Sequence, residues 1–303
     1  LMPGFLYTYQ KFREEIELPI AVNQDANKME RLQRMIRPFI LRRLKGDVLK
    51  DLPEKIEENV FARLDGEQMQ LYDAYATRMK EMLSQQNEKE FHKGRMQILS
   101  ELTKLRQLCC DPALVYENYE GGSAKLDLCI ELIQSAVESG HKILLFSQFT
   151  SMIEILTARL QEESISCFVL QGSTKKEQRA QMVEQFNRDD TSVFCISLKA
   201  GGTGLNLTGA DIVIHYDPWW NVAVENQATD RAHRIGQKNV VTVYKLIAKG
   251  TIEEKIIKLQ QMKKELAEEI LSGDEIKTAS FQREELLELL DCLLYTSPSP
   301  RDM

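Results

Sequence analysis

Residues 193–215 read VFCISLKAGGTGLNLTGADIVIH. Two short apolar runs, Val193–Ile196 and Ile212–His215, enclose a glycine-rich turn, and runs of this kind are typical of buried strands. The pattern extends in both directions, with helical segments of about 10–15 residues between further apolar runs at Ile143–Phe146, Cys167–Leu170 and Val240–Leu246. Because strands that alternate with helices form βαβ units, the sequence predicts an α/β fold: a parallel sheet with helices on both faces.

The segments on either side of this pattern have helical spacing. Residues 1–122 include the amphipathic stretches Leu64–Leu83 and Ile98–Leu108, and Ile252–Leu271 reads as a long charged helix. We therefore expect a helical region over residues 1–122, the α/β domain over 123–250 and packed helices over 251–291. A threonine followed three residues later by glutamate predicts capping boxes at Thr174 and Thr251.

The two ends of the chain call for separate treatment. The chain begins at Leu1 rather than at a methionine, which suggests truncation. Residues 292–303 read CLLYTSPSPRDM and resemble the translation of a sequencing adapter, so we expect them to have no structural role. A natural tail rich in proline and serine is the alternative.

The composition argues against membrane, secreted and metal-binding proteins. The formal net charge is -7, which argues mildly against nucleic-acid binding unless the basic residues gather on one face. The sequence contains no apolar run of about 18 residues, so we expect no membrane span. The N-terminus lacks a signal-peptide pattern, so secretion is not expected. The six cysteines form no C-x-x-C pair, so we expect reduced buried thiols, no metal site and a cytoplasmic protein, nucleoid-associated if bacterial.

The glycine-rich turn and a pair of arginines carry the chemistry. Successive backbone N–H groups in the turn can hold an anion such as phosphate, although some turns of this type only redirect the chain. Arg231 and Arg234 are three residues apart, so on a helix they share a face. Two guanidinium groups that point together repel unless an anion lies between them, and a triphosphate suits that need. The alternative is a solvated face paired with Asp230 and Glu225.

A third segment, His215-Tyr-Asp-Pro-Trp-Trp-Asn221, follows a predicted strand. Two adjacent tryptophans pack in a core or an interface more often than they contact a ligand. The same order of motifs continues with Gln227-Ala-Thr-Asp-Arg-Ala-His-Arg-Ile-Gly-Gln237.

Together these segments resemble motifs V and VI of the SWI/SNF-like family of superfamily II helicase-like DNA translocases. The resemblance covers about residues 1–290 and extends to Ile143-Leu-Leu-Phe-Ser-Gln-Phe149 and Leu170-Gln-Gly-Ser-Thr174, as well as Pro38–Lys45, Asp51–Lys55 and Leu105–Pro112. It implies a RecA-like second motor lobe of the P-loop NTPase type over residues 123–250. The end of the first motor lobe and a helical linker region would precede it over residues 1–122, and brace-like helices would follow over 251–291. Val222 departs from the family, which usually has proline there, and we expect this to soften a turn only.

The resemblance also implies a division of labour between two lobes. ATP lies between them in this family, and the first lobe holds the Walker A lysine and most contacts to Mg²⁺. No G-x-x-x-x-G-K-[ST] motif is present here, so we expect that lobe upstream of Leu1 and no ATP hydrolysis by this chain alone.

The family pattern assigns roles to residues of this chain. It makes Arg231 and Arg234 arginine fingers, with nucleotide contacts or sensing by Gln227, Gly202, Gly204 and Asp230. It implies contacts to the backbone of double-stranded DNA by Ser147, Gln148, Ser173, Thr174, Lys199 and Thr203, with Lys175 and Lys176 as further candidates. For the three lysines, the alternative is an ordinary solvated surface. A DNA-bound protein target is a further possible partner.

Two other readings compete with a motor lobe. A degenerate, non-catalytic lobe that binds protein or nucleic acid would not need the intact arginine pair. A doubly wound enzyme such as a glycosyl transferase would share the sheet and the glycine-rich turn but would not need that pair beside Gln227 and Gln237.

Overall fold

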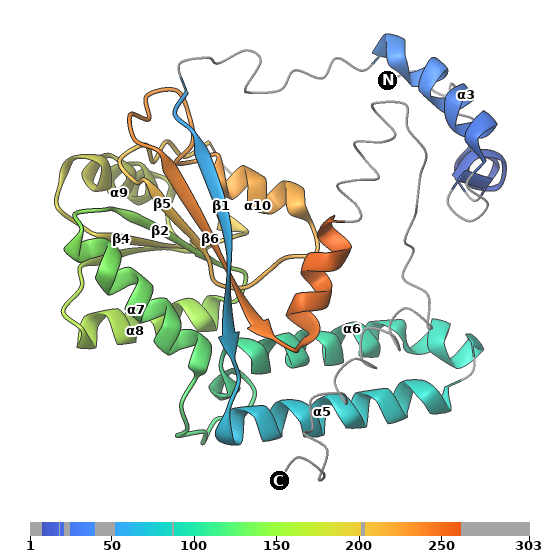
Figure 1. Cartoon of the computed structure of the whole chain (residues 1–303), viewed down its shortest axis with the longest axis horizontal. Helices are drawn as coiled ribbons and strands as arrows, with labels where there is room; N and C mark the ends of the chain where they lie inside the picture. Colours follow the sequence, from blue (N-terminus) through green and yellow to red (C-terminus); the bar gives the residue numbers. More distant parts are fainter. Residues whose placement is uncertain are drawn as a thin grey trace, which may run out of the picture. The chain divides into compact units, whose positions relative to one another are not determined.

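The computed structural model describes residues 8–17, 19–20, 25–39, 52–86, 88–200 and 204–261 (Figure 1). The chain divides into two compact units, one of Leu1–Lys50 with Ile257–Phe281 and one of Asp51–Ile256 with Gln282–Met303. None of the helices in the described ranges is long and apolar enough to cross a membrane.

The first unit contains short helices around a small apolar cluster. They are α1 (Tyr9–Phe12), the π-helical turn η1 (Arg13–Glu17), α3 (Ala26–Ile36) and the 3₁₀ turn η2 (Arg37–Phe39). Ile16, Ile20 and Met29 are buried together, and Phe12 and Leu32 pack against them. The predicted link residues 40–51 lie outside the described residues.

The second unit is built on a parallel sheet, as the sequence predicted. Its described strands lie in the order β1-β6-β5-β2-β4-β3, and every neighbouring pair is parallel. The strands are β1 (Lys55–Arg63), β2 (Ile143–Ser147), β3 (Cys167–Leu170), β4 (Val193–Ser197), β5 (Ile212–His215) and β6 (Val241–Lys249).

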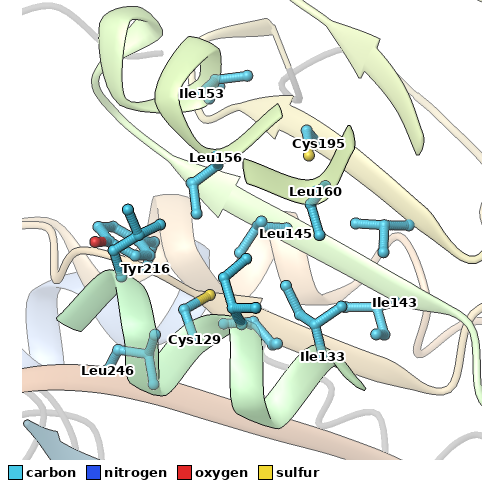
Figure 2. Close-up of a cluster of buried hydrophobic side chains, with 14 of the residues drawn as sticks. Cys129, Ile133, Ile143, Leu145, Ile153, Leu156, Leu160, Cys195, Tyr216 and Leu246 are labelled. Carbon is cyan, nitrogen blue, oxygen red and sulfur yellow. The ribbon is translucent and has the colours of Figure 1, made fainter. Parts of the chain in front are cut away.

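Helices cover both faces of this sheet because its central strands are apolar on both sides. On β2, Ile143 and Leu145 pack into one cluster, while Leu144 and Phe146 pack into the other. The first cluster lies under α7 (Ala124–Glu138) and α8 (Thr150–Glu162), and Figure 2 shows its side chains. The second lies under α9 (Lys176–Arg188) and α10 (Val222–Thr229).

An antiparallel pair of helices precedes the sheet's central strands. These are α5 (Gly66–Gln85) and α6 (Glu88–Cys110), followed by the 3₁₀ turn η3 (Pro112–Leu114). The Gln68 amide near the start of α5 donates to the Leu108 carbonyl near the end of α6, at 3.0 Å, and accepts from the Ala124 N–H at 3.1 Å. One side chain thus joins α5, α6 and α7.

The prediction of a mostly helical region over residues 1–122 missed one strand, at Lys55–Arg63. This segment is β1, which pairs with β6 from Lys55↔Val241 to Arg63↔Lys249. As an edge strand it is mostly exposed, so it lacks both the apolar run of a central strand and a clear alternation. The structure therefore places β1, α5 and α6 in the same unit as the sheet, not in a separate region that ends at residue 122.

The predicted capping boxes also differ in detail. Helix α9 begins one residue later than expected, with Lys175 as its N-cap, and the Thr174 hydroxyl instead accepts from the Gln171 N–H at 3.1 Å. At the helix that starts at Ile252, the Glu254 carboxylate accepts from Gly250 rather than from Thr251, while the Thr251 hydroxyl accepts from the Glu253 N–H.

Candidate functional site

The sheet changes its winding direction between β2 and β5, which are adjacent strands. The chain leaves β2 into α8 on one face and leaves β5 into α10 on the opposite face. In open α/β sheets, ligands bind outside the carboxyl ends of the strands at such a switch point. Ser147, the last residue of β2, and Asp217, two residues beyond β5, lie at this point.

The Asp217 carboxylate joins the ends of the two strands. Its Oδ1 accepts from the Ser147 hydroxyl at 2.5 Å, and its two oxygens lie 3.2 and 3.3 Å from the Gln148 backbone N. Burial raises the pKa of Asp217, and the nearby Arg106 charge opposes that rise. The side chains of Asp217 and Ser147 are both fully enclosed, so this network fixes the start of the loop into α8.

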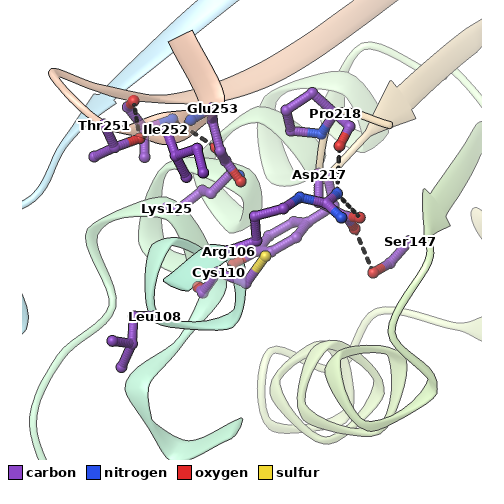
Figure 3. Close-up of polar contacts among 12 residues, drawn as sticks. Arg106, Leu108, Cys110, Lys125, Ser147, Asp217, Pro218, Thr251, Ile252 and Glu253 are labelled. Atoms are coloured by element: carbon purple, nitrogen blue, oxygen red, sulfur yellow. Dashed lines mark hydrogen bonds and ion pairs between the residues drawn. The ribbon is translucent and has the colours of Figure 1, made fainter. Parts of the chain in front are cut away.

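Arg106 brings a buried cation from α6 to the same place (Figure 3). Its Nη2 donates to the Pro218 carbonyl at 2.5 Å and lies 3.8 Å from Asp217 Oδ2. The guanidinium carbon lies 5.6, 5.4 and 5.7 Å from the ring centroids of Phe149, Trp219 and Trp220. The tryptophan pair therefore packs on a cation from α6, as the core or interface interpretation anticipated.

A side-chain cap and a buried carboxylate fix the start of α10. The Asn221 side chain caps the helix by accepting from the Ala223 N–H at 3.0 Å. Glu225, in the first turn, accepts from the Trp219 N–H at 2.6 Å and lies 3.7 Å from Lys245 of β6. Lys245 in turn lies 3.3 Å from Glu57 of β1. The edge of the sheet is thus connected to the tryptophan loop through alternating charges.

The arginine pair follows α10 instead of lying on it, which corrects the sequence-based expectation. The helix ends at Thr229, and residues 230–236 form successive turns, with the Arg234 N–H donating to the Ala232 carbonyl at 3.1 Å. The Gly236 backbone, at a φ of 103°, completes the change of direction. The sequence did not reveal the end of the helix at Thr229, because neither proline nor glycine occurs between Val222 and Ile235 to interrupt it.

Arg231 and Arg234 nonetheless have the electrostatics of an anion site. Arg231 is only 7% exposed, and its Nε has no hydrogen-bond partner among the described residues. Burial lowers the pKa of Arg231, and the Arg234 charge lowers it further. Arg234 is exposed. An anion between the two guanidinium groups would relieve both the repulsion and the unmet donor, so the residues present fit a nucleotide phosphate.

The arginine segment is tied to the connection that follows the glycine-rich turn. The Leu207 N–H donates to the Arg231 carbonyl at 3.0 Å, and the His233 ring lies 2.8 Å from the Pro53 carbonyl. Gly204, the last glycine of the glycine-rich turn, is exposed and has a φ of 49°, a left-handed conformation that favours glycine.

The other predicted site residues differ in how exposed they are to solvent. Gly202 and Thr203 lie outside the described residues. Gln227, Ser173 and Lys199 are exposed, while Asp230, Thr174 and Gln148 are half-buried. Ser147, a predicted DNA contact, is instead buried, and its hydroxyl donates to Asp217. Ser147, Gln148, Ser173, Thr174 and Lys199 all follow or end strands β2, β3 and β4, so they share the carboxyl edge of the sheet.

Sequence reasoning did not identify Asp217 and Arg106 as partners. Both lie within motifs that the sequence singled out, yet they are separated by more than a hundred residues. The available signal was Arg106 itself, the one charged residue within Leu105-Arg-Gln-Leu-Cys-Cys110.

Comparison with known proteins places these features in one family. The helicase conserved C-terminal domain matches residues 124–236, and the SNF2-related domain matches residues 1–114. An uncharacterised ATP-dependent helicase of Mycoplasma pneumoniae is 39% identical over 295 residues, which are 96% of this chain and 28% of that protein. The chain thus spans less than a third of the length of the curated relatives it matches.

Two solved structures from Sulfolobus solfataricus are also similar. The SWI2/SNF2 ATPase C-terminal domain is 32% identical with a TM-score of 0.62, and the match covers 81% of this chain and 100% of that one. The SWI2/SNF2 ATPase core in complex with dsDNA is 35% identical with a TM-score of 0.66, covering 98% of this chain and 62% of that one.

Proposed function

Because this chain belongs to the SWI2/SNF2 family of ATPases, we propose that it supplies the second motor lobe of an ATP-dependent translocase on double-stranded DNA. One observation carries the proposal: the buried Arg231, whose Nε has no partner among the described residues, lies three residues from the exposed Arg234. Two neighbouring cations with an unmet donor are best explained by an anionic ligand.

The arginines would act as fingers on the phosphate that is transferred. Arg231 and Arg234 would neutralise the charge that develops on this group, and Gln227 and Asp230 would orient them. Mg²⁺, when bound with ATP, neutralises phosphate charge, and we place its protein contacts mainly on a first lobe outside this chain. The chain by itself would then hydrolyse no ATP.

The carboxyl edge of the sheet would bind the DNA backbone. Gln148, Ser173, Thr174 and Lys199 lie there, and contacts to phosphate carry no sequence information. The enclosed Ser147 hydroxyl would act indirectly by holding Asp217, which accepts from the Gln148 N–H. A related SWI2/SNF2 ATPase core is known in complex with dsDNA, which supports duplex DNA as the partner.

The proposal is tested by the ATPase rate of a longer protein that joins this chain to its Walker A lobe. We expect duplex DNA to stimulate the rate, and Arg234→Ala to lower the stimulated rate by about 10³-fold or more. Arg234→Lys should rescue little, because an ammonium group lacks the forked geometry. Arg188→Ala is the matched control, since Arg188 is also exposed, lies on α9, and pairs with Glu184.

Two outcomes would overturn the proposal. Steady ATP turnover by the isolated chain would show that no other lobe is needed. An unstimulated, Arg234-independent rate in the longer protein would favour the second candidate, a degenerate lobe that binds DNA or protein without catalysis.

A further inference from the structure

The side chain of Gln237 uses its entire hydrogen-bonding capacity inside the protein. Its Nε2 donates to the Ala210 carbonyl at 2.7 Å and to the Ala232 carbonyl at 3.2 Å. Its Oε1 accepts from the backbone N–H groups of Lys238 at 2.8 Å and Asn239 at 2.9 Å. An amide has two donor hydrogens and an oxygen with two lone pairs, so all four positions are filled. The residue is 7% exposed.

These four bonds join three backbone segments that carry different parts of the site. Ala210 lies at the end of the connection from the glycine-rich turn into β5. Ala232 lies between Arg231 and Arg234, and Lys238 and Asn239 lead into β6. A second link, from the Leu207 N–H to the Arg231 carbonyl, runs between the first two segments.

The arginine segment needs such a support because it is not helical. Helix α10 ends at Thr229, and turns hold residues 230–236 without the regular hydrogen-bond ladder of a helix. The Ala232 carbonyl accepts from the Arg234 N–H within the segment, and the Gln237 amide adds the bond that ties this carbonyl to the Ala210 segment. Misplacing a catalytic group by about 1 Å can cost about 10²-fold in rate, so the backbone beneath two arginines is a sensitive position.

We propose that Gln237 is a positioning residue: it holds the backbone of Arg231 and Arg234 in register with the connection from the glycine-rich turn, so that the arginines are set in place before phosphate binds. The inference rests on the proposed function. Gln237 touches neither nucleotide nor DNA in this role, and acts through the Ala232 and Ala210 carbonyls.

Gln237→Glu is the most selective test, because it keeps the volume and the acceptors for Lys238 and Asn239. It replaces the donor with an oxygen that faces two carbonyls. We expect the DNA-stimulated kcat of the longer protein to fall at least about 10-fold, with the KM for ATP changed less than about twofold.

The pH dependence of this variant separates positioning from general damage. Burial against carbonyl oxygens should raise the pKa of the introduced carboxyl group, and its protonated form can donate one hydrogen bond again. Lowering the pH from about 8 to about 6 should therefore restore part of the lost kcat relative to the unsubstituted protein. Gln237→Met, which has a similar volume and no titrating group, should lose activity at both pH values.

A second readout needs no catalysis. In hydrogen–deuterium exchange on the 303-residue chain, Gln237→Glu should speed exchange in peptides that cover residues 230–239, while strand β4 stays protected. Asn187→Ala is the matched control, because the Asn187 amide clamps the same connection at Asn206 and Gly209, at 2.8 and 2.9 Å. It should speed exchange around residues 206–209 and leave residues 230–239 unchanged.

The outcomes distinguish this inference from the proposed function. If Arg234→Ala abolishes stimulated turnover but Gln237→Glu and Gln237→Met retain it, the positioning role is wrong and the motor assignment stands. Lost activity with unchanged exchange at residues 230–239 and no recovery at low pH would also overturn the role. If Arg234→Ala has no effect, the proposed function itself fails.

Discussion

His215 ends β5 with its imidazole ring enclosed by the protein. The Nε2 atom lies 2.9 Å from the Thr229 hydroxyl, and the ring stacks on Phe146 with centroids 5.6 Å apart. Its Nδ1 has no hydrogen-bond partner in the described part of the chain. Burial lowers the pKa of His215 to about 3, and the charge of Lys245 adds to that effect. The last turn of α10 is therefore held by a histidine that stays neutral.

This histidine should make the folded state sensitive to acid. Its folded pKa lies below the ordinary value of 6.5, so neutral His215 stabilises the fold fully above that pH. As the pH falls from 6.5 towards 3, the unfolded chain takes up the proton and the folded chain does not. The free energy of unfolding therefore falls by up to about 1.4 kcal/mol per pH unit in this range. Urea unfolding at stepped pH should show a shallower decline for His215→Gln; equal slopes would contradict the assignment.

The sequence alone could predict a functional residue where its charge and its distance along the chain from a like charge are enough to indicate a ligand. Arg231 and Arg234 attract attention because two neighbouring cations need an anion, whatever the local backbone does. Ser147 was predicted to contact DNA, because a hydroxyl at the end of a strand looks available until its partner is known. That partner, Asp217, lies 70 residues away, and only the pairing of β2 with β5 brings the two together.

At the scale of elements, the burial of each strand explains whether the sequence could predict it. Central strands such as β2 and β4 are buried on both faces, so their apolar runs stand out against polar helices. Edge strand β1 has exposed residues along most of its length and no such run. The end of α10 at Thr229 was also missed, since the tertiary bonds of the arginine segment, not a local breaker, stop the helix.

A buried ion pair fixes the helix that follows β6. Lys125 Nζ of α7 lies 2.6 Å from both carboxylate oxygens of Glu253, and both side chains are fully enclosed (Figure 3). Burial by itself would lower the pKa of Lys125, but the Glu253 carboxylate outweighs it and the pKa is raised. Glu253 also accepts from the Ala248 N–H at 2.8 Å, so one carboxylate holds both α7 and the end of β6.

Removing one member of this pair should cost far more than removing both charges. Lys125→Met leaves a buried carboxylate without its cation, which typically costs about 3–5 kcal/mol of stability. Adding Glu253→Gln should recover most of that loss, because the amide oxygen still accepts from Ala248 and no charge remains. Urea unfolding of the single and double variants measures the difference, and additive losses would rule out charge burial as the cause.

At the scale of the whole molecule, the net charge of -7 means that DNA binding depends on where the cations lie. Lys175 and Lys176 are exposed at the start of α9, and Lys199 is exposed just beyond β4. The helix dipole disfavours positive charge at an N-terminus unless an anion is present. A DNA phosphate at this edge would bind both the lysines and the first N–H groups of α9, which offsets the acidic remainder of the surface.

This arrangement predicts a specific salt dependence. Each phosphate contact releases counterions, so the logarithm of DNA affinity should fall with the logarithm of salt concentration by about 0.9 per contact. Lys175→Ala combined with Lys176→Ala should reduce that slope by up to about 1.8 and weaken binding equally for unrelated duplex sequences. Arg188→Ala removes a cation from the last turn of the same helix, where it already pairs with Glu184 at 2.8 Å, and should leave the slope unchanged. Fluorescence anisotropy between about 50 and 200 mM salt measures all three proteins, and an equal loss of slope in the Arg188 variant would mean that overall charge, not this edge of the sheet, governs binding.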